Sequence, residues 1–270
     1  MASNLVSIQR RGFGQTMRKD NWWVAPALTF IGLGAFVVYS TWAAFQGNNY
    51  FFDGGGAHYL SPFYSPEIFG ATPHAMFGVK PPWIPDWVPF SPALLVLWAP
   101  GGFRFTCYYY RGAYYKAMWA DPVACAVGEP RSGYRGERRF PLVLQNIHRY
   151  FLYLALIFLV FLVYDAWKAL WFVGTDGREH FGVGVGSLIL TANFICLGLY
   201  TFSCHSLRHL VGGAWDVLSN KPVRKKAHEC ASALNKRHML FAWISLFVVG
   251  FSDIYVRMLS MGIWTDWRLF

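Results

Sequence analysis

Five long apolar stretches dominate this chain of 270 residues. About 20 mostly apolar residues suffice for a helix to cross the hydrocarbon core of a bilayer, and each stretch reaches that length. Hydrophobic residues make up 55% of the chain and charged residues only 14%, whereas soluble domains carry about a quarter charged residues. The sequence therefore predicts an all-α integral membrane bundle of five transmembrane helices, forming a single domain over residues 1–270. The predicted spans are Trp22–Phe45, Val88–Tyr110, Ile147–Phe172, Gly182–Leu210 and His238–Met261.

Two of these spans depart from a simple helix. Pro100 and Arg104 lie inside the second span, which predicts a broken or kinked helix whose freed backbone groups find partners in neighbouring protein or water. The fourth span is long enough to tilt or to project beyond the bilayer. The outer loop between the first two spans, from Gly47 to Trp87, is aromatic and poor in charge. We expect it to lie against the membrane surface as a lid.

Lysine and arginine are distributed unevenly between the loops. The N-terminus and the loops after the second and fourth spans are strongly basic, whereas the opposite side holds little more than Lys80, Arg178 and Arg268. The positive-inside rule then places the N-terminus in the cytoplasm and the C-terminus outside, in a multi-pass protein of the inner (cytoplasmic) cell membrane. The basic face either attracts anionic lipid headgroups or docks a soluble partner. No nucleic acid is expected, because these residues flank membrane spans and form no separate domain.

Cysteines and histidines gather near the cytoplasmic ends of the spans. Cys107 lies at the end of the second span, and Cys125 follows in the next loop, close enough in sequence to fold back on it. Polar groups near the bilayer interior are costly and are therefore functional candidates. A single buried cysteine is more often a packing residue, so their shared depth is what indicates a site. The histidines at this depth are His148, His205, His209 and His238.

Spacing along two helices adds local detail. His205 and His209 are four residues apart and share one helix face. In the outer half of the fifth span, Asp253 and Arg257 have the same spacing, which favours an ion pair between them.

Several motifs resemble the single membrane-anchor subunit of succinate dehydrogenases of the five-helix kind. The resemblance covers most of the chain from Trp22 onward. It implies a complex in which a flavoprotein subunit oxidises succinate, an iron–sulfur subunit relays electrons, and this chain docks both and carries the quinone site. The motifs are Phe105-Thr106-Cys107-Tyr108-Tyr109-Tyr110-Arg111, Gln145-Asn146-Ile147-His148-Arg149-Tyr150-Phe151, His205-Ser206-Leu207-Arg208-His209-Leu210 and Asp253…Arg257…Asp266…Arg268.

The chain departs from the family in its potential cofactor ligands. Familiar five-helix anchors hold two b haems with histidines from spans one, two, four and five, whereas span one here has no histidine and span two offers Cys107. Two cysteines and two histidines at one level match the ligands of a Rieske-type [2Fe–2S] cluster. Zinc on the same residues, or a b-type haem between two histidines, are the alternatives. The predicted ligands are Cys107 and Cys125 on one iron and His209 and His238 on the other, with His205 and His148 as substitutes.

Quinone is expected near the cytoplasmic face, where electrons arrive from the docked iron–sulfur subunit. Its headgroup requires hydrogen-bond donors beside an apolar slot. Residues that supply such groups also fit an aromatic belt with positive-inside arginines. They are Tyr109, Tyr110, Arg111, His148 and Arg149.

Two other functional classes remain open from the sequence. The chain fits the anchor of a different quinone-linked dehydrogenase, which would change only the soluble partner. A transporter is compatible with charges at several depths, but it has no evident use for a level of cysteines and histidines.

Overall fold

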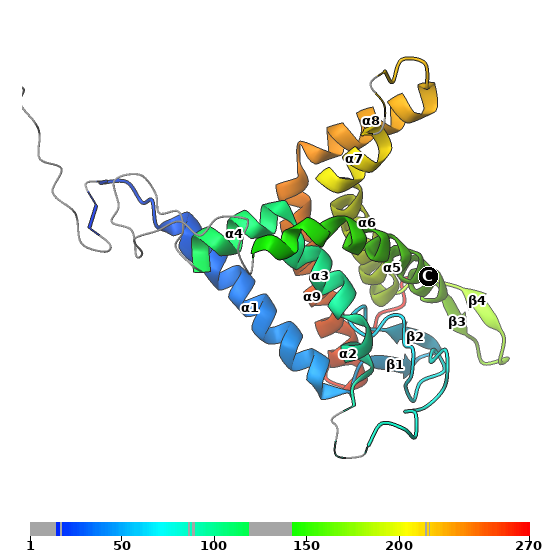
Figure 1. Cartoon of the computed structure of the whole chain (residues 1–270). Coiled ribbons are helices and arrows are strands. Elements are labelled where there is room, and N and C mark those ends of the chain that lie inside the picture. The colour runs from blue at the N-terminus through cyan, green and yellow to red at the C-terminus, as the bar shows by residue number, and fades with distance from the viewer. Residues whose placement is uncertain are drawn as a thin grey trace, which may run out of the picture.

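The protein is a helical bundle with two short β hairpins, seen in a computed structural model (Figure 1). The structure describes residues 15–16, 18–85, 87, 90–118, 142–213, 215 and 217–270. The long helices are α1 (Val24–Gln46), α5 (His148–Lys168), α6 (Val185–Phe202) and α9 (His238–Ser260). The shorter helices are α2 (Pro92–Val96), α3 (Trp98–Thr106), α4 (Tyr108–Met118), η1 (Leu142–Ile147), α7 (His205–Gly212) and α8 (Pro222–Asn235). The strands are β1 (Phe51–Gly54), β2 (Ala57–Leu60), β3 (Trp171–Val173) and β4 (Glu179–Phe181).

Among the described residues, four helices are long and apolar enough to span a membrane, namely α1, α5, α6 and α9. The predicted all-α membrane bundle is therefore confirmed, but not as five single helices. The predicted second span, Val88–Tyr110, instead contains α2, α3 and the start of α4, joined at Leu97 and Cys107. Pro100 lies in the first turn of α3, where its missing N–H removes no helical hydrogen bond.

The fourth predicted span, Gly182–Leu210, also ends earlier than the hydropathy suggests. Helix α6 stops at Phe202, and α7 begins at His205 after a two-residue break. Helices α7 and α8 pack against each other and project from one end of the bundle (Figure 1). Apolar residues continue from α6 into α7, so hydropathy alone does not predict where α6 ends and the chain changes direction.

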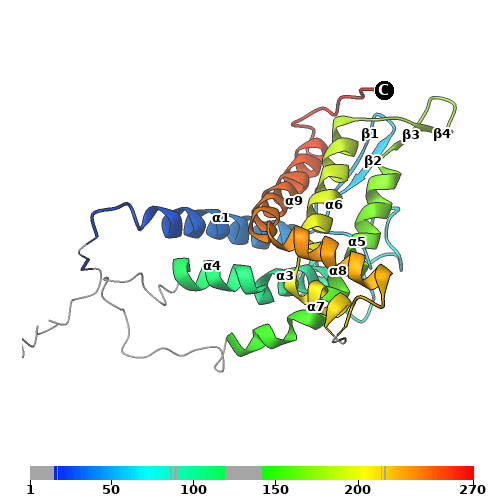
Figure 2. The ribbon, with the colours of Figure 1, turned by 90° about the horizontal axis from the view of Figure 1, so that it is seen from above.

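The bundle has a packed centre and one loosely attached helix. Helix α6 packs against both α5 and α9, and α3 packs against α5. Helix α1 contacts mainly α4 and extends away from the other long helices (Figure 2). Its exposed apolar side chains, such as Ile31 and Val38, fit contact with lipid or with another protein chain.

The outer loop packs into the end of the bundle as well as covering it. Strands β1 and β2 pair within it as an antiparallel hairpin, and Tyr59, Tyr64 and Ser65 are fully buried. The Tyr64 hydroxyl donates to the carbonyl of Ala43 near the end of α1 at 2.7 Å and accepts from the N–H of Gly47 at 3.1 Å. The loop therefore supplies part of the core, beyond the surface lid that its composition predicted.

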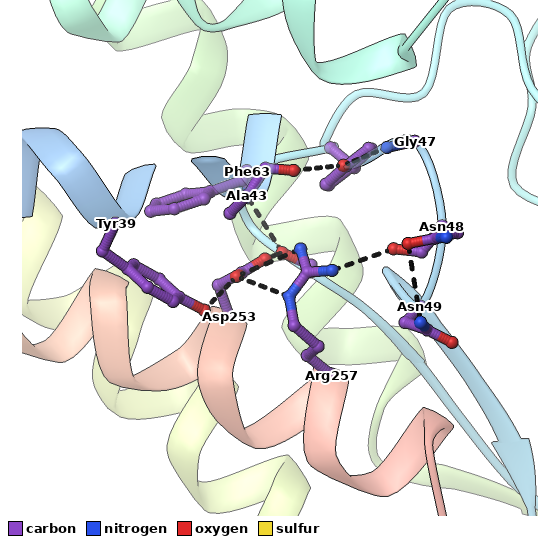
Figure 3. A network of polar contacts seen from close by, with 10 residues as sticks. Tyr39, Ala43, Gly47, Asn48, Asn49, Phe63, Asp253 and Arg257 are labelled. Atoms are coloured by element: carbon purple, nitrogen blue, oxygen red, sulfur yellow. Dashed lines mark hydrogen bonds and ion pairs between the residues drawn. The ribbon is translucent and has the colours of Figure 1, made fainter. Parts of the chain in front are cut away.

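Asp253 and Arg257 form the ion pair that their spacing predicted (Figure 3). The arginine Nε lies 3.4 Å from Oδ2 of the aspartate, and both side chains are buried. Asp253 also accepts hydrogen bonds from the hydroxyls of Tyr39 in α1 and Ser61 in the outer loop. Arg257 donates to the carbonyl of Asn48 at 3.0 Å. The pair therefore joins α1, the outer loop and α9.

We expect Asp253→Asn to lower the free energy of unfolding by about 3–5 kcal/mol, because it leaves the buried Arg257 charge uncompensated. Thermal unfolding of the purified protein in detergent measures the effect. Asp53→Asn is the control, since its contact with His58 is largely exposed and contributes about 0–1 kcal/mol. Equal shifts for the two variants would contradict this assignment.

Candidate functional site

Two helices break in the same way, each at a cysteine. Cys107 joins α3 to α4 with φ −62° and ψ 132°, and Cys204 joins α6 to α7 with φ −65° and ψ 139°. Each cysteine N–H donates to the carbonyl three residues earlier at 3.2 Å, and each cysteine carbonyl accepts from the N–H four residues later. Both thiols are 2% exposed and belong to one buried cluster.

Each cysteine faces a histidine from another helix. The Cys107 Sγ lies 3.3 Å from Nε2 of His238, the first residue of α9. The Cys204 Sγ lies 3.0 Å from Nε2 of His148, the first residue of α5. Two cysteine–histidine pairs, Cys107–His238 and Cys204–His148, thus come together where α3, α5, α6 and α9 meet.

The residue before each cysteine holds the histidine of the other pair. The Oγ1 of Thr106 lies 2.8 Å from Nδ1 of His148, and the Oγ of Ser203 lies 2.7 Å from Nδ1 of His238. The arrangement is reciprocal. Thr106 precedes Cys107 but contacts His148, which faces Cys204, and Ser203 precedes Cys204 but contacts His238, which faces Cys107. The four-residue site is defined here as Cys107, His148, Cys204 and His238.

These hydrogen bonds determine the histidine tautomers. The Thr106 hydroxyl donates its hydrogen to the carbonyl of Gly102 at 2.7 Å, and the Ser203 hydroxyl donates to that of Tyr200 at 2.9 Å. A hydroxyl has a single hydrogen to donate, so each accepts a hydrogen bond from the Nδ1–H of its histidine. Nε2 therefore carries the lone pair in both His148 and His238, and it points at a sulfur. Neutral imidazole nitrogen and cysteine sulfur are the atoms that bind soft transition metals.

Aromatic rings enclose the site. Phe103 stacks on His148 with ring centroids 4.8 Å apart, and Tyr200 stacks on His238 at 5.2 Å. Phe103 and Tyr200 meet edge to face at 5.4 Å. Each imidazole therefore has one face covered by an aromatic ring, and Cys107, His148 and Cys204 are buried whereas His238 is half-buried.

Arg104 lies one turn before Cys107 on α3. Its guanidinium donates to the Tyr110 hydroxyl at 2.7 Å and to Ser245 Oγ at 3.0 Å, and it lies over the Tyr200 ring at 4.7 Å. Within the part of the chain that the structure describes, no carboxylate pairs with Arg104. A positive charge without a carboxylate partner therefore stands beside the four-residue site.

Some of the ligands predicted from the sequence lie in the four-residue site, and others lie elsewhere. Cys107 and His238 contact each other, and the substitute His148 belongs to the second pair. Cys125 lies outside the described residues. His209 lies on the exposed α7, with its Nε2 2.9 Å from that of His205. Partial burial, together with His209 and Arg208, lowers the pKa of His205.

Cys204 is the ligand candidate that the sequence reasoning missed. Its signal is a hydroxyl residue directly before a cysteine at the end of an apolar span, which occurs at both Thr106-Cys107 and Ser203-Cys204. No three side chains of His, Cys, Asp or Glu in the described ranges are placed to hold one metal ion together. The candidate donors form two separate pairs.

The residues predicted for quinone are divided between core and surface. The Tyr110 hydroxyl donates to the carbonyl of Ala242 at 2.6 Å and is buried. Tyr109 accepts a hydrogen bond from the Trp243 indole at 2.6 Å. The guanidinium of Arg111 lies 4.3 Å from the Tyr108 ring centre. His148 belongs to the four-residue site, and Arg149 is exposed at the start of α5.

The chain is similar to known proteins of one family. Residues 24–262 match the family described as actinobacterial succinate dehydrogenase subunit SdhC. The chain belongs to this family. A solved structure, the Mycobacterium smegmatis Sdh1 complex in the apo form, contains a chain that is 44% identical, with a TM-score of 0.84 and 100% of both chains covered. No curated protein sequence matches the chain. The predicted resemblance and the multi-pass location in the cytoplasmic membrane are confirmed.

The close packing of α3 against α5 behind the four-residue site can be tested by substitution. A Cβ at Gly102 would lie 2.2 Å from the Phe151 ring, whereas a Cβ at the neighbouring Gly101 meets nothing within 4 Å. We expect Gly102→Ala to destabilise the protein by about 1–3 kcal/mol through overpacking. Gly101→Ala is expected to be neutral or stabilising by up to about 1 kcal/mol, since alanine favours helix. Thermal unfolding measures both, and equal effects would contradict the close contact between α3 and α5.

Proposed function

We propose that this chain is the membrane anchor of a succinate dehydrogenase that docks a flavoprotein subunit and an iron–sulfur subunit at its basic cytoplasmic face and passes their electrons to quinone. Family membership and full-length similarity to a chain of the Sdh1 complex support this proposal. They favour it over an anchor for another dehydrogenase and over a transporter. The described residues form membrane helices and short connections, so we assign succinate oxidation itself to the soluble partners.

We further propose that the four-residue site binds a Rieske-type [2Fe–2S] cluster. The observation that carries the proposal is the reciprocal arrangement of two cysteine–histidine pairs with both Nε2 lone pairs directed at sulfur. Two thiolates and two neutral imidazoles are the donor set of such a cluster. When bound, the cluster takes up and releases single electrons at a higher potential than an all-cysteine cluster. Relative to the sequence-based set, Cys204 replaces Cys125, and His148 replaces His209.

The chain's own residues prepare this site in three ways. Thr106 and Ser203 fix the tautomers of the two histidines, as partners of metal-bound imidazoles do in metal sites. Phe103 and Tyr200 each cover one face of an imidazole. Arg104 supplies a positive charge beside the site, which favours the added negative charge of a reduced centre.

Ligand variants test the assignment in the purified complex. His148→Ala and Cys204→Ser should each abolish the Rieske-like electron paramagnetic resonance signal of the reduced complex and lower iron and acid-labile sulfide by the content of one cluster. His209→Ala should retain both, because His209 lies on α7 in contact with His205. Loss of the signal in His209→Ala, with retention in His148→Ala, would restore the sequence-based set. A b-haem optical spectrum, or zinc without sulfide, would support the alternative cofactors instead.

Removal of the hydroxyl partners gives a second test. Ser203→Ala and Thr106→Val leave the four donor side chains in place but remove the acceptor for each Nδ1–H. Loss of such partners typically lowers metal affinity by about 10–100-fold, so we expect faster loss of iron to a chelator at unchanged protein assembly. Ser219→Ala, an exposed hydroxyl between α7 and α8, is the matched control. Chelation at the wild-type rate in all three variants would contradict a tautomer-setting role.

A further inference from the structure

A cavity of about 800 Å³, the outer cavity, lies where the outer loop and the β3–β4 hairpin meet the end of α5. Asp165 and Lys168, both in the last turn of α5, line it. This end of α5 faces the outside in the topology that the basic loops predict, and the exposed rings of Tyr164 and Trp167 lie at the same level. Because tyrosine and tryptophan gather at the headgroup level of a bilayer, the outer cavity stands beside the outer headgroups.

Acidic side chains outnumber basic ones in the lining of the outer cavity. Burial lowers the pKa of His74, so its imidazole is neutral at neutral pH. Asp53 lies 3.3 Å from the imidazole of His58 and balances any charge there. The remaining groups are three carboxylates and one lysine, so a cationic group complements the cavity. The acidic, basic and imidazole side chains that line it are Glu67, His58, His74, Asp165, Lys168 and Glu179.

Asp165 has acceptor positions to spare in the outer cavity. Its side chain is 9% exposed, and Oδ2 accepts a hydrogen bond from the Ser65 hydroxyl. Among the described residues, no group donates to its Oδ1. By contrast, the Glu67 carboxylate accepts from two hydroxyls, and Glu179 pairs with Lys168 at 3.2 Å. An ionised carboxylate accepts through both oxygens, so Asp165 suits a ligand that brings N–H donors.

The outer cavity also offers hydrogen-bond donors. Trp171 of β3 lines it, and its buried indole N–H has no hydrogen-bond partner in the described part of the chain. Lys168 carries three N–H donors, and within the described ranges its ion pair is with Glu179. An oxyanion such as a phosphate accepts hydrogen bonds from both groups. The cavity therefore fits a zwitterion, with an amine for Asp165 and a phosphate for Trp171 and Lys168.

An apolar groove leads away from the outer cavity along α5 and α6. Its volume is about 440 Å³, and its lining is apolar, with Leu156 and Val163 on α5 and Phe194 on α6. Val160 lines both the groove and the outer cavity, so the two are adjacent. The Val160 side chain is 68% exposed, which opens their junction toward the lipid. A molecule with a zwitterionic head and an alkyl chain therefore matches the two hollows together.

We propose that the outer cavity and this groove bind one phospholipid of the outer leaflet whose headgroup ends in a primary amine, the chemistry of phosphatidylethanolamine. The ammonium group donates to Asp165, the phosphate accepts from Lys168 and Trp171, and one acyl chain lies against Val160 in the groove. The lipid then joins α5 to the outer loop and to the β3–β4 hairpin. A soluble amine would leave the groove empty, and a lipid without an amine would leave Asp165 without donors.

Lipid exchange on the whole purified complex tests the headgroup. The complex is stripped of lipid in detergent, incubated with an equimolar mixture of phosphatidylethanolamine, phosphatidylcholine and phosphatidylglycerol with identical chains, and analysed by native mass spectrometry. We expect phosphatidylethanolamine to be retained at least about tenfold over phosphatidylcholine, since a hydrogen bond to a charged group is worth that factor. Equal retention of the three lipids, or a preference for phosphatidylglycerol, would overturn the proposal.

Asp165→Asn separates the charge from the shape of the cavity. Asparagine keeps the size of the side chain and an oxygen for Ser65 but removes the negative charge, so the preference for phosphatidylethanolamine should disappear. Asp176→Asn is the matched control, because Asp176 lies in the exposed turn between β3 and β4 and does not line the cavity. A preference that persists in Asp165→Asn would show that the carboxylate does not bind the amine.

Val160→Trp tests the acyl chain independently of charge. The larger side chain fills the junction between cavity and groove, and its exposed position leaves the core packing unchanged. We expect retention of phosphatidylethanolamine to fall to that of the other two lipids. Val38→Trp on α1 is the control, since Val38 is 72% exposed and lines neither hollow. Wild-type retention in Val160→Trp would refute the bound lipid, and because these measurements count lipid rather than electrons, their outcome is independent of the proposed function.

Discussion

The site depends on one constraint, which is that a backbone group freed inside a bilayer must find a protein partner. Both cysteines interrupt a helix, and each break leaves carbonyl groups without their helical donors. At the second break the side chain of Asn235 donates to the carbonyl of Ser203 at 2.7 Å. At the first, the Tyr114 hydroxyl donates to the carbonyl of Phe105 at 3.4 Å. The breaks are thus stabilised by tertiary contacts, and they release Cys107 and Cys204 to face histidines from other helices.

Two arginines of the bundle, the half-buried Arg104 and the buried Arg257, have different roles. Arg257 pairs with Asp253 and binds the outer loop to the bundle, so its charge is neutralised in the resting protein. Among the described residues, the hydrogen-bond partners of Arg104 are neutral, and its guanidinium lies over the Tyr200 ring. A protein that only needed stability would be expected to neutralise or replace such a cation. Its position beside two cysteine–histidine pairs fits the proposed chemistry, in which negative charge arrives and leaves.

The sequence predicted the parts of this structure that depend on local pattern. Hydropathy located four long helices, and the spacing of Asp253 and Arg257 predicted their ion pair. Sequence proximity favoured Cys125 as the partner of Cys107, and the i, i+4 spacing of His205 and His209 favoured a ligand on α7. The break at Cys204 moves both histidines onto an exposed helix, and only the meeting of α3, α5, α6 and α9 brings Cys204 and His148 together. Such a meeting leaves no periodic signal in the sequence.

The reciprocal hydrogen bonding also makes the two halves of the site interdependent. Thr106 belongs to the segment of Cys107 but holds the histidine that faces Cys204, and Ser203 does the reverse. A shift of α3 relative to α6 therefore disturbs both cysteine–histidine pairs at once, so neither pair has its final geometry without the other. Tyr200 stacks on His238 and also lines a cavity of about 350 Å³ bordered by α1, α3 and α5, and it is held by the same packing. The same packing of helices therefore determines both the geometry of the four-residue site and the shape of the cavity beside it.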